Sequence, residues 1–314
     1  MTLPTLNFVS CPDTSGNHRM AYWIWGAADA AHVVVCAHGL SRQGRDFDAL
    51  AAGLLERSPH PLRVVCPDVV GRGRSDWLAD PQGYGIPQYA GDMLQLLQQL
   101  QAAAPVGTLD WVGTSMGGLI GMTLCGAPKL PLPVPVRRLV LNDVGPVIQW
   151  TALQRIGTYL GNTGKFASVQ EAAEAMWQIS RSFGPHTPQQ WLALSQAMVK
   201  ALPDGGFTLH YDPAIATPFR ALTEADAAAG QEALWRLYDA VRARTLLLRG
   251  ADSDLLARET ALEMTRRGPL PRLLEFEGVG HAPTLVADTQ VAAVAAFLLD
   301  TESASDEKPY SGTG

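Results

Sequence analysis

Apolar residues along this chain follow two recurring patterns, which predict strands and helices in alternation. Residues 33–38 begin Val-Val-Val-Cys-Ala, and a continuous β-branched run of this kind is typical of a strand buried on both faces. Residues 87–103 place Met93, Leu97 and Leu100 on one face, as in an amphipathic helix. The alternation predicts an α/β fold, a mostly parallel eight-stranded sheet with helices on both faces. Strands are expected at 5–10, 20–25, 33–38, 62–68, 109–112, 138–143, 244–250 and 272–277, and core helices at 46–57, 87–103, 116–125, 256–267 and 289–299.

The pattern changes between residues 145 and 242, where strand-like runs disappear and aromatic-bearing helical segments replace them. We interpret 145–242 as a helical insertion in a core made of residues 1–144 and 243–300. Binding elements on such sheets gather at the carboxyl ends of the strands, so we expect a lid there rather than a side layer. The tail, 301–314, is polar and is expected to be disordered. Helices of the insertion are expected at 149–160, 169–183, 188–201 and 232–241.

Residues 108–125 combine a predicted strand, a tight turn and a helix, and the turn reads Gly113-Thr-Ser115-Met-Gly117, a G-x-S-x-G motif. A turn from strand to helix in so few residues forces its central residue into a strained conformation. Glycines two positions away remove the side chains that would collide there. Such a turn holds a serine oxygen out at the carboxyl edge of the sheet, so Ser115 is a candidate nucleophile.

A serine hydroxyl is a poor nucleophile at neutral pH, so it needs an imidazole to take its proton and a carboxylate to orient that imidazole. His281 lies in a glycine-rich loop after the last predicted strand, and Asp252 and Asp254 follow the strand before it. Parallel strands bring these loops to the same edge of the sheet as Ser115. The order Ser, Asp, His along the chain therefore supports a catalytic role for His281.

Five motifs follow one another along the chain: His38-Gly39 after the third strand, Asp68-x-x-Gly71-x-Gly73-x-Ser75 after the fourth, the turn around Ser115, the acidic loop after Gly250, and Gly280-His281. This ordered set resembles the α/β-hydrolase fold superfamily, over about residues 20 to 299. The resemblance implies a serine hydrolase with an oxyanion hole of two backbone N–H groups. One belongs to Met116, beside the serine, and the other is carried over to Leu40. Removing such a donor typically costs on the order of 3 kcal/mol of transition-state stabilisation.

Three aspartates compete for the position beside His281. Asp254 ranks first, because similar proteins place the acid just before an apolar pair, here Leu255-Leu256. Asp143 ranks second, because some members of the superfamily use the loop after that earlier strand. Asp252 ranks third, because it can instead cap the helix that follows.

Three residues are expected to contact the substrate. Arg42 lies in the loop after the expected oxyanion residue and is placed to meet an anionic group, although a solvated surface arginine is the alternative. Trp150 and Trp177 are expected to form an apolar pocket wall, although some aromatic residues of the insertion must fill its own core. His38 is interpreted as a structural support of the oxyanion loop.

The composition limits the classes of partner and cofactor that this chain is expected to bind. With 24 basic and 30 acidic residues the net charge is −6, and no basic run occurs, so we expect no nucleic acid. The chain lacks a membrane-length apolar run and a signal-like start, so we expect a cytoplasmic protein without a membrane partner. The four cysteines are widely spaced and are expected to be buried thiols, and no metal-ligand spacing is recognisable. Gly71-Arg-Gly73 lacks the third glycine of a dinucleotide fingerprint, so neither a cofactor nor a metal is expected.

We therefore expect a serine hydrolase that cleaves a carboxylic ester of a small, largely apolar substrate through an acyl-serine. One alternative is a hydrolase of carbon–carbon bonds in ring-fission diketones, which the Ser-Met-Gly-Gly sequence also resembles. Another is a small-molecule receptor that retains the fold but not fast turnover. The only partner expected is the small-molecule substrate, with the chain a monomer or a homodimer.

Overall fold

A computed structural model describes residues 3–300, in which all eight predicted strands join one sheet in the order β1-β2-β4-β3-β5-β6-β9-β10. Only the pairings of β2 with β1 and with β4 are antiparallel; the others are parallel. The predicted disordered tail, 301–314, lies outside the described residues. The strands are β1 (Thr5–Asp13), β2 (Gly16–Gly26), β3 (His32–Ala37), β4 (Arg63–Pro67), β5 (Thr108–Thr114), β6 (Val136–Asn142), β9 (Arg244–Gly250) and β10 (Arg272–Phe276).

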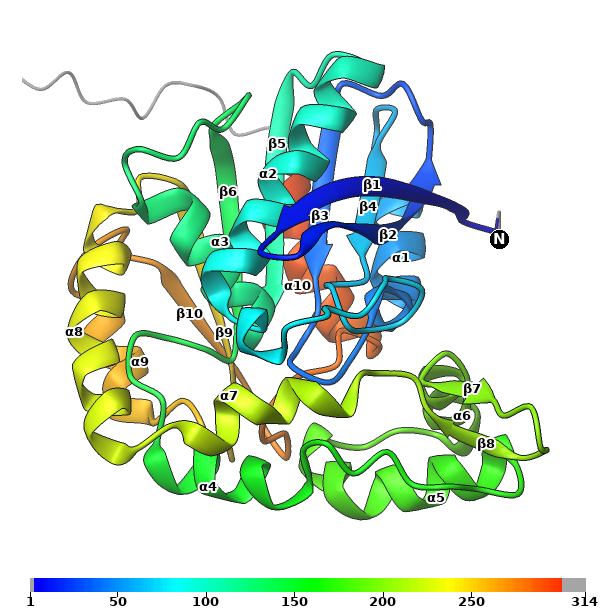
Figure 1. The fold of residues 1–314 in the computed structure, drawn as a ribbon. Coiled ribbons are helices and arrows are strands. Elements are labelled where there is room, and N and C mark those ends of the chain that lie inside the picture. The colour runs from blue at the N-terminus through cyan, green and yellow to red at the C-terminus, as the bar shows by residue number, and fades with distance from the viewer. Residues whose placement is uncertain (1–2, 301–314) are drawn as a thin grey trace, which may run out of the picture.

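Helices cover both faces of the sheet, and this explains the continuous apolar strands (Figure 1). Successive side chains of a strand point to opposite faces. Val33 and Val35 accordingly join one apolar core, whereas Val34 and Cys36 join the other. The first core includes side chains of α2 (Ile86–Ala103), α3 (Met116–Gly126), α8 (Glu224–Ala240) and α9 (Arg258–Met264), and the second those of α1 (Asp48–Arg57) and α10 (Asp288–Leu299). Within residues 3–300, no helix is long and apolar enough to cross a membrane.

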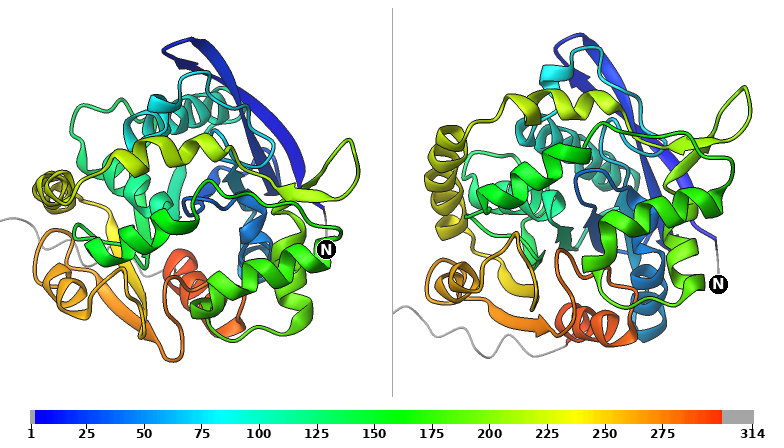
Figure 2. Two further views of the ribbon diagram at one scale, coloured as in Figure 1. Left: turned by 60° about the horizontal axis from the view of Figure 1, so that its bottom comes forward. Right: turned by 90° about the horizontal axis from the view of Figure 1, so that it is seen from below.

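Most of the predicted insertion, residues 145–242, lies beneath the carboxyl ends of the parallel strands (Figure 1), and Figure 2 shows it from below. Its last helix, α8, instead packs against α3 at the side of the sheet. The insertion has a small apolar core of its own, which includes Met176 and Trp191. Its elements are α4 (Trp150–Tyr159), α5 (Val169–Ser180), α6 (Pro188–Gln196), β7 (Val199–Ala201), β8 (Phe207–Leu209), α7 (Ala216–Ala221) and α8. Short 3₁₀ turns are η1 (Gly44–Phe47), η2 (Pro81–Gly83), η3 (Arg181–Phe183) and η4 (Pro213–Ile215).

The insertion is not entirely helical, which corrects the sequence-based assignment of residues 188–201. The helix ends at Gln196, and the chain then forms the two-stranded β7–β8 hairpin. Gly205 and Gly206 both have positive φ, 91° and 78°, in the turn between these strands. A Gly-Gly pair is a recognised signal for a hairpin turn, so Asp204-Gly205-Gly206 indicated the hairpin in the sequence. The helical pattern of residues 188–201 led to the wrong assignment.

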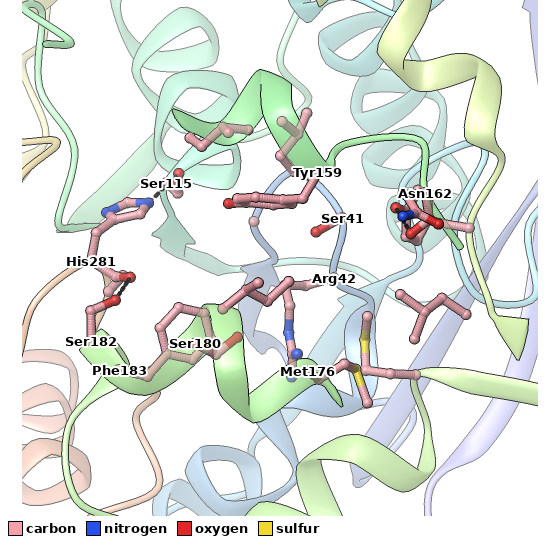
Figure 3. Close-up of a pocket in the computed structure, with 18 of the residues that line it drawn as sticks. Ser41, Arg42, Ser115, Tyr159, Asn162, Met176, Ser180, Ser182, Phe183 and His281 are labelled. Carbon is pink, nitrogen blue, oxygen red and sulfur yellow. Dashed lines mark hydrogen bonds between the residues drawn. The ribbon is translucent and has the colours of Figure 1, made fainter. Parts of the chain in front are cut away.

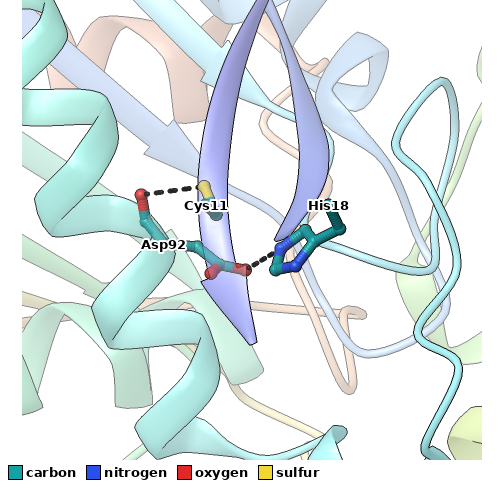
Figure 4. Close-up of side chains that lie close together, drawn as sticks. All are labelled: Cys11, His18 and Asp92. Atoms are coloured by element: carbon teal, nitrogen blue, oxygen red, sulfur yellow. Dashed lines mark hydrogen bonds and ion pairs between the residues drawn. The ribbon is translucent and has the colours of Figure 1, made fainter. Parts of the chain in front are cut away.

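A buried ion-pair cluster fastens the opening hairpin to the first core. His18 of β2 lies between two carboxylates, with Nδ1 2.9 Å from Asp13 and Nε2 3.0 Å from Asp92 of α2 (Figure 4). The Cys11 thiol adds a weak contact to the Asp92 carbonyl oxygen. Burial opposes protonation of His18, but hydrogen bonds and charge from Asp92 and Asp13 outweigh it and raise the pKa of the imidazole. The protonated ring donates to both carboxylates, whereas a neutral ring has only one N–H to offer.

This cluster predicts a pH-dependent contribution to stability. Because the folded pKa of His18 is raised above the ordinary value of about 6.5, its contribution is complete below that value and is lost as the pH rises through the folded pKa. His18→Gln should cost about 3 kcal/mol at about pH 6, as expected for breaking a buried pair, and less at about pH 9. Urea unfolding of both proteins at the two pH values measures this. A cost that does not fall at the higher pH would contradict the charged state of His18.

Candidate active site

Ser115 occupies a strained turn between β5 and α3. Its φ of 52° and ψ of −115° lie outside the regions that L-residues normally adopt. A Cβ on Gly117 would lie 2.0 Å from the Ala37 carbonyl oxygen, and one on Gly113 would lie 2.3 Å from that of Gly117. A side chain at either Gly113 or Gly117 would therefore clash with the backbone. The two glycines together allow the backbone conformation that exposes the serine.

Ser115 and His281 lie within hydrogen-bonding distance, and so do His281 and Asp143. His281 Nε2 lies 2.9 Å from Ser115 Oγ, and Nδ1 lies 2.6 Å from Asp143 Oδ2. Asp143 is fully buried and also accepts hydrogen bonds from the Gly250 amide (2.9 Å) and the Ser253 hydroxyl (2.6 Å). A buried carboxylate with three donors is held in one orientation, so it can fix the tautomer and position of the imidazole.

The acid beside His281 is Asp143, and the first-ranked prediction, Asp254, was wrong. Asp254 is exposed and forms a two-bond ion pair with Arg155 of α4, at 2.8 and 3.0 Å. Asp252, ranked third, is also exposed. The reason is strand order: β6 is the direct neighbour of β5, with Asn142 paired to Thr114, so the residue after β6 lies beside the residue after β5.

The backbone N–H groups of Leu40 and Met116, which were predicted to form an oxyanion hole, are both without an acceptor within residues 3–300. Met116 is the first residue of α3, and a first-turn N–H has no acceptor within its helix. The Leu40 amide likewise finds no acceptor within residues 3–300. Both residues line a cavity that reaches Ser115. Two amides free to donate beside the serine are what a developing oxyanion requires.

Arg72, which sequence reasoning did not single out, touches both of these residues. Its guanidinium is fully buried, with Nε donating to the Leu40 carbonyl oxygen at 2.8 Å and Nη2 3.7 Å from the Met116 sulfur. Nη1 donates to the Val70 carbonyl oxygen at 2.7 Å and to the Tyr89 hydroxyl at 3.1 Å. Arg72 therefore holds the Leu40 peptide group in place through its carbonyl oxygen. In the sequence, the glycines on either side of Arg72 were compared only with a dinucleotide fingerprint, which gave no indication of this role.

His38 supports the same loop, as expected. Its Nδ1 lies 2.7 Å from the Gly39 carbonyl oxygen, and its Nε2 accepts from the Val69 amide at 2.9 Å. Burial, assisted by the nearby charges of Arg72 and Arg42, lowers the pKa of His38 to about 3 despite the bond to Gly39. The ring is therefore neutral, which matches one donating and one accepting nitrogen.

Two cavities meet at Ser115. The His281 cavity has a volume of about 360 Å³ and is lined by residues including Arg42, Tyr159, Asn162, Met176, Phe183 and His281 (Figure 3). The apolar cavity has a volume of about 370 Å³ and is lined by residues including Ile86, Met116, Leu119, Val144, Ile148 and Phe219. Both volumes fall within the range of small-molecule sites.

Of the three predicted substrate contacts, only Arg42 lines either cavity. Trp150 is the first residue of α4. Its side chain is half-buried and lines neither cavity. Trp177 stacks edge-to-face on Trp191 at 4.9 Å, inside the core of the insertion. Its neighbour Met176 faces the His281 cavity, and one residue along a helix is a rotation of about 100°, which turns Trp177 away.

No metal-ligand set was recognisable in the sequence, but the structure brings Cys11, His18 and Asp92 together with their donor atoms within 4.8 Å of one another. Both nitrogens of His18 already face carboxylates, and this set belongs to the opening hairpin and α2 rather than to the loops around Ser115. Of the four cysteines, which are all free thiols, three are buried as expected.

Residues 34–296 match the model of the alpha/beta hydrolase family, and the chain belongs to that family. It is 50% identical over 298 residues to a 3-hydroxybutyrate-oligomer hydrolase of Cupriavidus necator, which covers 94% of this chain and 98% of the relative. A solved putative hydrolase of Rickettsia typhi has a TM-score of 0.81 and 26% identity, covering 94% of this chain and 98% of its own. A solved alpha/beta hydrolase of Novosphingobium aromaticivorans has a TM-score of 0.79 and 32% identity, covering 95% of this chain and 99% of its own. The predicted family and sheet are thus confirmed.

Proposed function

We propose that this chain hydrolyses carboxylic esters through an acyl-serine intermediate and that its substrates are oligomers of 3-hydroxybutyrate. The observation that carries the chemistry is the hydrogen-bonded series Ser115, His281 and Asp143. The substrate is suggested by the relative in Cupriavidus necator, because half of all residues are identical over almost the whole of both chains.

Each residue has one task in the proposed reaction. Ser115 Oγ attacks the ester carbonyl carbon while His281 Nε2 takes the hydroxyl proton, and Asp143 stabilises the resulting imidazolium. The carbonyl oxygen becomes an oxyanion that accepts hydrogen bonds from the Leu40 and Met116 amides. The carbon–oxygen bond then breaks, and His281 returns the proton to the leaving alcohol. Water, deprotonated by His281, attacks the acyl-serine, releases the acid and regenerates Ser115.

The inserted segment acts as a lid in this proposal. Residues of α4, α5 and β8 line the His281 cavity, and residues of α7 and α8 line the apolar cavity. The Ser182 carbonyl oxygen also accepts a hydrogen bond from the Gly280 amide, next to His281, at 2.5 Å. The insertion thereby shields the reacting bond from bulk water and shapes the space around it.

A turnover panel tests the proposed function. The purified chain should hydrolyse the 3-hydroxybutyrate dimer and trimer with a higher kcat/KM than a butyrate ester of a simple alcohol, while an amide and a ring-fission diketone should be much poorer substrates. Liquid chromatography of the released acids measures this. Cleavage of the diketone with no hydrolysis of esters would replace the proposal by carbon–carbon hydrolysis. Binding of the dimer without turnover would favour a receptor.

A further inference from the structure

The two cavities share only a few lining residues, and the nucleophile is among them. Leu40, Ser115 and Ile156 line both, so the cavities approach the reacting centre from two sides. An ester attacked at its carbonyl carbon also has two sides, the acyl part and the alcohol part. Each part of the ester therefore has one cavity available to it.

The position of the proton donor decides which part of the ester enters which cavity. His281 lines the His281 cavity and not the apolar cavity, whereas Met116 lines only the apolar cavity. The alcohol oxygen must receive its proton from His281 Nε2, so it has to lie on the histidine side of Ser115. The acyl chain then extends from the carbonyl carbon into the apolar cavity.

Charge favours the same assignment. The His281 cavity is lined by two guanidinium groups, Arg42 and Arg155, and by no carboxylate; each guanidinium is paired with an aspartate outside the lining, Asp46 and Asp254. Arg42 binds Asp46 through Nε and Nη2, at 2.6 and 2.7 Å, and its Nη1 has no hydrogen-bond partner within residues 3–300. The apolar cavity has Asp226 as its only charged lining residue. A substrate carboxylate is therefore favoured in the first cavity and disfavoured in the second.

We propose that the His281 cavity binds the leaving alcohol through its carboxylate end, with Arg42 Nη1 as the principal donor, and that the apolar cavity binds the acyl portion. This assignment rests on the proposed function. In a 3-hydroxybutyrate oligomer, the part that leaves as the alcohol always carries the free carboxylate, and the acyl part carries only hydroxyl, methyl and ester groups. The carbonyl carbon–oxygen bond breaks, the alcohol oxygen gains the proton of His281 Nε2, and the acyl group stays on Ser115 Oγ. The chemistry of the substrate and the charges of the two cavities thus agree.

A matched pair of dimers tests the position of the carboxylate. The wild-type enzyme should hydrolyse the free-acid dimer with a kcat/KM at least about tenfold above that of the dimer methyl ester, as expected for losing a hydrogen bond to a charged group. In Arg42→Gln this ratio should fall towards one, through KM of the free acid. Arg45→Gln is the matched control, because Arg45 lies three residues further along the chain, pairs with Asp48 and lines neither cavity. An unchanged ratio in Arg42→Gln, or a wild-type ratio near one, would overturn the assignment; the wild-type ratio suffices should the variant not fold.

A second variant tests the acyl side. Ile148→Trp narrows the apolar cavity and should lower the preference for octanoyl over butyryl 4-nitrophenyl esters without changing the ratio between the two dimers. The opposite pattern, with Arg42→Gln changing acyl-length preference and Ile148→Trp changing the dimer ratio, would exchange the two cavities.

The proposed substrate and the cavity assignment can fail separately. If neither dimer is hydrolysed, the substrate proposal fails, and butyrate esters of phenol and of 4-hydroxybenzoate then test the assignment alone. These two esters share an acyl group and differ in one carboxylate on the leaving group. The assignment requires a preference for the carboxylate-bearing ester that disappears in Arg42→Gln, and equal preference in both proteins would contradict it.

Discussion

Ser115→Ala is expected to lower kcat for ester hydrolysis by about 10⁶-fold, the loss typical of removing the nucleophile of a serine triad. Alanine removes only Oγ, whose one hydrogen-bonding partner within residues 3–300 is His281. The turn itself is held by backbone bonds, including those from the Gly118 and Leu119 amides to the Ser115 carbonyl oxygen. Initial rates with a butyrate ester measure the effect, and thermal unfolding shows whether the fold is retained.

The position of His281 sharpens this test. If water attacked the ester directly and His281 acted only as a base, Ser115→Ala would retain most of the activity. A residual rate within about tenfold of wild type would therefore contradict the acyl-serine route, since the loss would amount to only about 1.4 kcal/mol.

Asp143→Asn is expected to lower kcat by about 10⁴-fold, because the amide favours the wrong tautomer of His281. The Gly250 amide donates to Oδ1 of Asp143, so the substituted side chain would keep its carbonyl oxygen there and place its NH₂ at the position of Oδ2. That NH₂ would donate to His281 Nδ1, which now lies 2.6 Å from Oδ2. The ring proton would then sit on Nε2, which could no longer accept the proton of Ser115.

Asp254→Asn is the matched control, with the same chemical change in the loop after the next strand. Its carboxylate is exposed and pairs with Arg155, and exposed ion pairs are worth at most about 1 kcal/mol, so kcat on a neutral ester should change by less than about tenfold. Initial rates of both variants over a range of pH provide the measurement. The reverse order, with Asp254→Asn the more damaging change, would contradict the assignment of the acid.

The sequence predicted the elements of this fold well where a residue pattern repeats over a whole strand or helix. All eight strands of the sheet were predicted. The central ones, such as β3, are buried on both faces and therefore have a continuous apolar sequence, whereas β1 is largely exposed and was recognised with β2 as a hairpin. The G-x-S-x-G turn was equally legible, since two steric contacts require its glycines. The β7–β8 hairpin was missed because each of its strands has only three residues, too few to show a period.

The acid and the pocket wall were harder to predict because they depend on neighbours distant in the sequence. Asp143 and Asp254 both follow a strand of the parallel sheet, and only the adjacency of β6 to β5 places Asp143 beside Ser115. That strand order is not written in either loop. The left-handed φ of 56° at Asp143 is likewise invisible in the sequence. Trp177 failed as a pocket residue because a helical face cannot be assigned before its packing partners are known.

The most direct test of the central claim is to locate the covalent bond. A serine-directed phosphonate with a short alkyl chain should inactivate the enzyme with one adduct per chain, and peptide mass spectrometry should place that adduct on Ser115. Asp143→Asn should react much more slowly, because its imidazole cannot accept the serine proton, and Ser115→Ala should not react. An adduct on another residue, or full activity in protein that carries the adduct on Ser115, would contradict the proposed mechanism.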